Sequence, residues 1–100
     1  MENKLLFSRV STTDMLALPA REVLGIAKVH ATELKIWFAG LDVSDNQGEI
    51  EVVTTNANAR TAIKAIVHEI NYGKTPMSTV ADEVDGVYLN GITAATSNTN

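Results

Sequence analysis

The segment TTNANARTAIKAIVHEINYGKTP, residues 54–76, is the part of this chain in which all local structural signals agree. Its apolar residues recur at intervals of three and four, which on a helical period of about 3.6 residues places them in one stripe: Ala59, Ala62, Ile63, Ile66, Val67 and Ile70. Arg60, Lys64 and Glu69 fall outside this stripe. We therefore expect an amphipathic helix over about residues 57–72, with one face in solvent and the other on an apolar surface.

Residues that favour a helix start and a helix end flank this segment. Thr55, Asn56 and Asn58 have short side chains whose oxygen atoms can accept hydrogen bonds from the free N–H groups of a first turn. Gly73 can adopt the left-handed conformation that closes a helix, and Pro76 cannot continue one. A helix of about sixteen residues is roughly 24 Å long at ~1.5 Å per residue, which is enough to cover a small sheet.

Strands are predicted on the N-terminal side of the helix. The first is Leu5 to Val10, which ends at a polar run over 11–14. Residues 15–22 leave two conformations open: an extended strand, which we favour because the residue before Pro19 avoids helical angles, or one helical turn opened by Pro19. The next strand, 23–30, has one face of small apolar residues that suits packing beneath the helix: Val23, Gly25, Ala27 and Val29.

Two hairpins are predicted next. Residues 33–39 alternate between apolar and polar or aromatic side chains, so they pair with 23–30; after a loop over 40–48, the alternating run 49–55 forms the second hairpin. Beyond the helix, 77–81 is a short strand, an acidic turn over 82–86 reverses the chain, and a last strand contains Val87, Leu89 and Ile92. The polar end, 96–100, is expected to be frayed.

These elements predict an α+β fold. The short connections require antiparallel pairing, so we expect a strongly bent antiparallel sheet or a small open barrel of about five to six strands, with the helix packed on it. A single helix leaves one face of such a sheet uncovered, and the sheet must either curl or hide that face in an oligomer. The length of 100 residues predicts a single domain over 1–100.

Composition limits the kinds of chemistry that the chain can support. It has no cysteine, which excludes disulfides, thiolate metal ligands and cysteine nucleophiles. Eight basic against twelve acidic residues give a net charge of −4, which does not favour long-range attraction to nucleic acid or anionic membranes. The apolar run near residue 5 is shorter than a signal-peptide core, so we expect a protein that is neither exported nor inserted in a membrane.

Motifs for catalysis, cofactor binding or metal binding are missing. His30 and His68 have no metal-ligand spacing and read as two unrelated side chains. The region 42–49 resembles a calcium loop, but Gln47 stands where such a loop needs glycine. The acidic run 82–85 has no apolar surroundings that would separate two carboxylate pKa values. We therefore expect no enzymatic activity, no cofactor and no metal.

Trp37 is the candidate interface residue, with Lys35 beside it on the same strand face. A large aromatic on the polar side of a strand is typical of an interface, so we expect a homo-oligomer that buries Trp37; the alternative is a closed barrel with Trp37 inside. For RNA or single-stranded DNA the candidates are Lys28, Lys35, Arg60 and Lys64, with Trp37, Tyr72 or Tyr88 as stacking surfaces. Acidic neighbours favour the reading of solvated faces over nucleic-acid binding.

A set of short segments resembles short virion-associated proteins of marine tailed phages. They are Leu18-Pro19-Ala20, Leu24-Gly25-Ile26, Leu34-Lys35-Ile36-Trp37-Phe38, Val52-Val53-Thr54-Thr55 followed by Ala62-Ile63 and Ile66, and Val80-Ala81-Asp82 before Val87-Tyr88-Leu89. The resemblance spans most of the chain, consists of hydrophobic patterns and assigns no functional residue. It implies a virion structural or assembly component, found in the virion or the host cytoplasm, with other phage structural proteins as partners.

The bent sheet is also similar in outline to Sm-like and SH3-like small barrels, and the Sm-like members bind RNA as rings. In those barrels the helix precedes the strands, whereas here it follows four of them. The leading interpretation is therefore a non-enzymatic structural protein that acts through self-association. The alternatives are an Sm-like oligonucleotide-binding barrel and, third, an uncharacterised enzyme.

Overall fold

The computed structural model of the chain describes residues 4–40 and 47–99. Within them the elements follow in the order β1 (Leu5–Ser11), β2 (Asp14–Pro19), the short 3-10 helix η1 (Ala20–Glu22), β3 (Val23–His30), β4 (Glu33–Gly40), β5 (Gln47–Thr54), the 3-10 helix η2 (Asn56–Asn58), α1 (Ala59–Tyr72), β6 (Met77–Asp82), β7 (Val87–Tyr88) and β8 (Ile92–Thr99).

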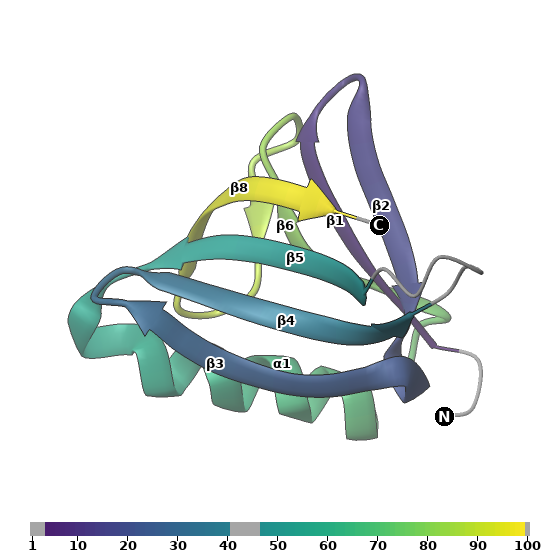
Figure 1. The fold of residues 1–100 in the computed structure, drawn as a ribbon, viewed down its shortest axis with the longest axis horizontal. Coiled ribbons are helices and arrows are strands. Elements are labelled where there is room, and N and C mark those ends of the chain that lie inside the picture. Colours follow the sequence, from purple (N-terminus) through teal and green to yellow (C-terminus); the bar gives the residue numbers. More distant parts are fainter. Residues whose placement is uncertain (1–3, 41–46, 100) are drawn as a thin grey trace.

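The strands form two four-stranded sheets, with the orders β2-β1-β6-β7 and β3-β4-β5-β8. Figure 1 shows α1 running along one face of the second sheet, while the β1–β2 hairpin rises at one side. Paired strands are antiparallel except β1 and β6, which are parallel. The predicted α+β class, with one helix packed on a bent and largely antiparallel set of strands, is confirmed.

The C-terminal stretch contains two strands where one was predicted, because the chain turns sharply at Gly91. This glycine has a φ of 89°, a left-handed conformation that glycine adopts without strain. A Cβ atom there would lie 2.8 Å from the backbone nitrogen of Ala62, so glycine also allows close approach to α1. The turn separates β7, which belongs to the first sheet, from β8, which belongs to the second. Together with β2, this gives eight strands in place of five to six.

Both conformations left open for residues 15–22 occur, one after the other. The chain is extended through β2 as far as Pro19, and Pro19 then precedes the single helical turn of η1. Proline suits both places, since its φ near −65° fits an extended strand end as well as a helix start.

Residues 96–99, where a frayed end is expected, belong to β8, which continues to Thr99. Ser97 and Thr99 pair with Glu51 and Glu49 of β5, and the Thr96 hydroxyl donates to the Glu51 carbonyl at 3.1 Å. Threonine fits a pleated, half-buried strand well. Polar composition alone therefore did not identify this strand.

The ends of α1 differ from prediction in two ways. Neither Thr55 nor Asn58 caps the helix with its side chain; the Asn58 N–H instead donates to the Thr55 carbonyl at 3.0 Å in a 3-10 turn. Gly73 is extended, with a φ of −61°, and not left-handed. Lack of space explains why a glycine is needed here, because a Cβ atom would lie 2.6 Å from the Glu69 carbonyl and would also collide with the buried Lys4 ammonium.

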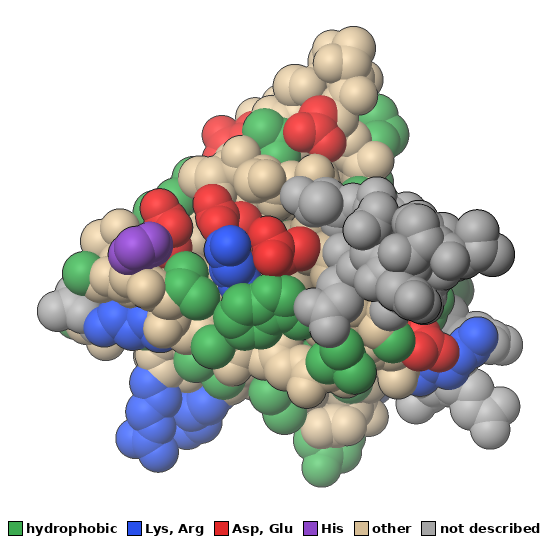
Figure 2. Space-filling view, viewed as in Figure 1, with side chains coloured by type: hydrophobic (Ala, Val, Ile, Leu, Met, Phe, Trp, Pro, Cys, Tyr) green, Lys and Arg blue, Asp and Glu red, His purple; other side chains and the backbone are tan. Residues whose placement is uncertain are grey.

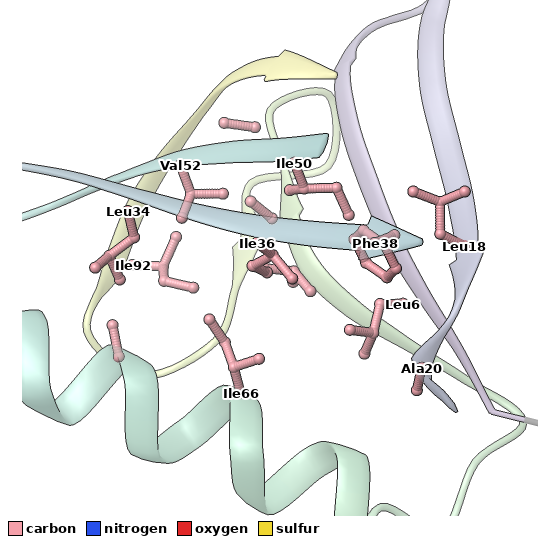
Figure 3. Packing of buried hydrophobic residues seen from close by; sticks show 14 of the residues in the cluster. Leu6, Leu18, Ala20, Leu34, Ile36, Phe38, Ile50, Val52, Ile66 and Ile92 are labelled. Carbon is pink, nitrogen blue, oxygen red and sulfur yellow. The ribbon is translucent and has the colours of Figure 1, made fainter. Parts of the chain in front are cut away.

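The core lies between α1 and the inner face of the β3-β4-β5-β8 sheet, and Figure 3 shows Ile66 pointing from the helix into it. Leu6 and Leu18 extend the core into the first sheet. Of the predicted stripe, Ala59, Ala62 and Ile66 are buried and Ile63 and Ile70 pack against them. Val67 is the exception, with 42% of its surface exposed, because at about 100° per residue it lies at the edge of the stripe.

Gly25 and Ala27 of the small apolar face of β3 point away from the helix, so the predicted place of these residues beneath α1 is wrong. Val23, on the other side of a register shift, pairs with the buried Phe38 and packs against the core. Ile26 pairs with the fully buried Ile36 and packs against the core, while Gly25 and Ala27 pair with Trp37 and Lys35 on the opposite face. The orientation of β3 follows that of β4, because directly paired residues point to the same side of a sheet.

The two sheets meet along β8 without closing into a barrel, so the alternative of a closed barrel with Trp37 inside is wrong. Side chains bridge this seam: the Asn98 amide donates to the Ser8 carbonyl at 3.0 Å, and the Ala95 N–H donates to the Glu83 carboxylate at 2.7 Å. A continuous strand ladder would need regular backbone hydrogen bonds between neighbouring strands. At this seam, the side chains of Asn98 and Glu83 make the connecting hydrogen bonds instead.

An ion pair joins the parallel strands β1 and β6. Arg9 donates to both carboxylate oxygens of Asp82, at 2.8 and 2.7 Å, and reaches Asp85 at 2.9 Å. The N–H groups of Val84 and Asp85 also donate to Asp82. The hydrogen bond from Arg9 lowers the pKa of Asp82 from its ordinary 3.8 to about 2. The acidic turn over 82–86 thus helps to hold the first sheet together.

We predict that Ile66→Asp unfolds the protein. Ile66 is fully buried, and an unpaired charge in an apolar core costs several kcal/mol against a total stability of about 5–15 kcal/mol. Val67→Asp, one position along on the exposed edge of the helix, is the matched control and should leave folding almost unchanged. Urea denaturation followed by circular dichroism measures both, and a cooperative, native-like Ile66→Asp variant would contradict the packing described above.

We also predict that Asp82 makes stability depend on pH at the acidic end. Because its folded pKa of about 2 is below the ordinary 3.8, its contribution is present above about pH 4 and is lost as pH falls toward 2. Asp82→Asn should lower stability at neutral pH and flatten the dependence between pH 4 and 2. Asp85→Asn, at a more exposed carboxylate, should keep most of that dependence. Equal pH profiles for Asp82→Asn and wild type, measured by urea denaturation, would refute this role.

Candidate interaction surface

The face of the β3-β4-β5-β8 sheet that points away from α1 is not covered by any described element, and we call it the outer face (Figure 1). Its members follow from the alternation of β4, in which Leu34, Ile36 and Phe38 are fully buried on the inner side. Strand pairing then places on the outer side Gly25 and Ala27 of β3, Glu33, Lys35 and Trp37 of β4, and Glu49, Glu51 and Val53 of β5.

Trp37 lies on β4, between β3 and β5 of the outer face, and is half-buried there. It pairs with Gly25 on one side and Glu49 on the other, and its indole N–H donates to the Glu49 carboxylate at 3.1 Å. A Cβ atom on Gly25 would meet nothing within 4 Å, so the surface beside the indole is open toward β3. The predicted position of Trp37, on the polar side of its strand, is confirmed.

Lys35 sits between two carboxylates on the same face. Its ammonium is 3.4 Å from Glu49 and 3.4 Å from Glu51, and the hydrogen bond with Glu49 raises the pKa of Lys35 above its ordinary 10.5. Glu49 therefore links Lys35 to Trp37. Glu33 adds a third carboxylate to this face and lies 3.9 Å from the His30 ring, so the outer face carries three carboxylates against one lysine and is acidic overall.

Figure 2 shows the same pattern on the space-filling surface. Hydrophobic side chains gather over β3 and β4, and acidic side chains surround a basic side chain beside them. The combination is an apolar patch next to a constrained charged cluster. A half-exposed tryptophan held by a hydrogen bond is a common anchor of protein interfaces.

The residues predicted for nucleic-acid binding are divided between two layers of the molecule. Lys35 is on the outer face, already paired with carboxylates, whereas Arg60 and Lys64 are exposed on the first turns of α1. Lys28 is exposed on β3, and Figure 2 shows basic side chains gathered where β3 ends and α1 begins. Single-stranded nucleic acid needs aromatic surfaces along a cationic track, and this arrangement separates Trp37 from Arg60 and Lys64.

The remaining candidate aromatics lie apart from the outer face. Tyr72 ends α1 with 70% of its surface exposed, and its ring centroid is 5.2 Å from that of His68. Tyr88 is half-buried in β7, where burial raises its pKa above the ordinary 10.0. His30 lies at the end of β3 and His68 lies on α1, so the two histidines belong to different elements.

The described residues contain neither a group of three or more metal-ligating side chains nor a pocket. Residues 42–46 of the calcium-like loop lie outside the described ranges, so the prediction of no calcium binding there stays a prediction. Within 4–40 and 47–99, no helix has both the length and the apolar character needed to cross a membrane.

Sequence reasoning missed the role of Glu49 and Glu51. Both were placed on a strand, but their partners depend on the register between β4 and β5, in which Lys35 lies opposite Glu51 and Trp37 opposite Glu49. The sequence between these strands contains no turn motif that fixes this register. The alternation of charged residues along each strand is therefore the only sequence signal for the pairing.

Comparisons with protein families, with curated proteins and with solved structures found no match.

We predict that Glu49→Ala makes the side chains of Trp37 and Lys35 less restrained. The Trp37 N–H loses its acceptor and the pKa of Lys35 falls toward its ordinary value, since the hydrogen bond with Glu49 is the main cause of its rise. Trp37 is the only tryptophan, so acrylamide quenching of its emission reports on this site alone and should increase. Glu33→Ala, on the same face but without a hydrogen bond to Trp37, is the control. Unchanged quenching in Glu49→Ala would argue against the Trp37–Glu49 bond.

Proposed function

We propose that this protein is a non-enzymatic structural protein that acts by self-association, and that the outer face around Trp37 is buried between subunits. The observation that carries this proposal is the position of the one tryptophan: α1 covers the inner face of the sheet, and Trp37 is half-buried on the other face. Hydrophobic side chains gather on this face (Figure 2), and monomeric proteins seldom expose a large contiguous apolar patch without a use for it.

The outer face has the properties of a prepared interface. The Trp37 ring is held by its hydrogen bond to Glu49, so little side-chain freedom remains to be lost on association. Gly25 and Ala27 beside it have small side chains and leave room for a partner residue against the indole. The charged cluster of Lys35, Glu49 and Glu51 would lie at the rim, where polar groups set orientation.

The resemblance to virion-associated phage proteins offers a setting for this activity. Virion components assemble from many copies, and a small domain with one uncovered sheet face suits such a lattice. Under this proposal the partners are further copies of the chain and other structural proteins of the same particle. Detection of the chain in purified particles by mass spectrometry would test the setting, separately from self-association itself.

The test of self-association is the Trp37→Ala variant. Aromatic anchors commonly contribute about 2 kcal/mol or more to an interface, so dissociation should become at least about 30-fold more favourable. Size-exclusion chromatography with light scattering, over a concentration series, should show a shift toward monomer. Far-UV circular dichroism should stay nearly unchanged, because Trp37 is outside the core cluster.

The matched control is Val87→Ala, an exposed apolar residue on the other sheet, which should assemble like wild type. A wild-type protein that is monomeric at high micromolar concentration, or a Trp37→Ala variant that assembles as wild type does, would contradict the proposal.

A further inference from the structure

The solvent-facing side of α1 is the cationic counterpart of the outer face. Its exposed residues, which we call the outer helix surface, are Arg60, Lys64, Val67, His68, Asn71 and Tyr72. Neither Arg60 nor Lys64 has an ion-pair partner in the described part of the chain. The one carboxylate of α1, Glu69, accepts a hydrogen bond from the hydroxyl of Ser78 in β6 at 2.5 Å.

This surface also has apolar area to offer. Val67 is 42% exposed and Tyr72 70% exposed, so the helix presents an aliphatic and an aromatic side chain among its cations. The outer face presents Trp37 among carboxylates. The two surfaces belong to opposite layers of the molecule, since α1 packs on the inner side of the sheet that bears Trp37. No single copy can therefore bring them together.

We propose that the outer face of one copy docks on the outer helix surface of a second copy, so that the chains associate head to tail. This inference rests on the proposed function, which buries Trp37 between copies, and it adds the surface that covers it. Charge selects this partner: Glu33, Glu49 and Glu51 would meet Arg60 and Lys64, and a guanidinium or ammonium group can also lie over the Trp37 ring.

A symmetric contact between two outer faces is disfavoured by the same charges. It would bring three carboxylates and one ammonium from each copy together, and like charges across an interface are repulsive. A head-to-tail contact instead leaves one unused surface at each end of every pair. Such heterologous association continues until it closes into a ring or extends as a filament.

The sharpest test mixes two variants that each lack one of the surfaces. Arg60→Glu/Lys64→Glu keeps the outer face and loses the cationic helix surface, whereas Trp37→Ala keeps the helix surface and loses the aromatic anchor. Each alone should associate at least about tenfold more weakly than wild type. Their mixture should form 1:1 dimers that grow no further, as measured by light scattering, because each pair has no intact surface left. Lys74→Glu, a charge reversal beyond α1, is the control that should assemble normally.

Cross-linking gives a second measurement that does not depend on charge reversal. The chain has no cysteine, so Ala27→Cys and Lys64→Cys introduce single thiols on the outer face and the outer helix surface. Under mild oxidation the mixture should form disulfide-linked heterodimers faster than either variant links to itself. Preferential linking of Ala27→Cys to itself would overturn the head-to-tail arrangement in favour of a symmetric contact.

The outcomes separate the two proposals. If wild type associates and Trp37→Ala dissociates, but Arg60→Glu/Lys64→Glu assembles as wild type does, the head-to-tail inference is wrong and the proposed function stands. If wild type is monomeric throughout the concentration series, the proposed function fails and this inference fails with it.

Discussion

Packing of α1 against one face of the β3-β4-β5-β8 sheet is the constraint from which the remaining structure follows. Ile66 and Ala62 of the helix meet Leu34, Ile36 and Val52 in a fully buried cluster. Because strand residues alternate between faces, burying Ile36 and Phe38 necessarily turns Lys35 and Trp37 outward. The helix that creates the core thus also determines which residues lie on the outer face.

The elements with strong periodicity could be predicted from the sequence. The helix stripe, the β3–β4 and β4–β5 hairpins and the outward position of Trp37 all depend on patterns of two or 3.6 residues within one segment. The capping residues at the helix ends were a poorer guide. The need for glycine at position 73 comes from the close approach of Glu69 and Lys4, and these contacts exist only in the folded chain.

Features that depend on distant segments were not predictable in this way. The parallel pairing of β1 with β6 joins residues about seventy positions apart, and the Arg9–Asp82 ion pair that supports it has no local signal. The strand at 96–99 is polar, and its pairing with residues 49–51 of β5 joins segments that are far apart in the sequence. The candidate surface combines both kinds: alternation places Trp37 on it, whereas Glu49 joins it only through the cross-strand register.

Burial of the outer face between copies of this chain, as proposed, can be measured directly, because Trp37 is the only tryptophan. Acrylamide quenching of Trp37 emission across a wide range of protein concentration reports how accessible the indole is as association proceeds. We expect an accessible indole at low concentration, with quenching that falls as concentration rises. Equal quenching at every concentration, with no change in the emission maximum, would contradict it.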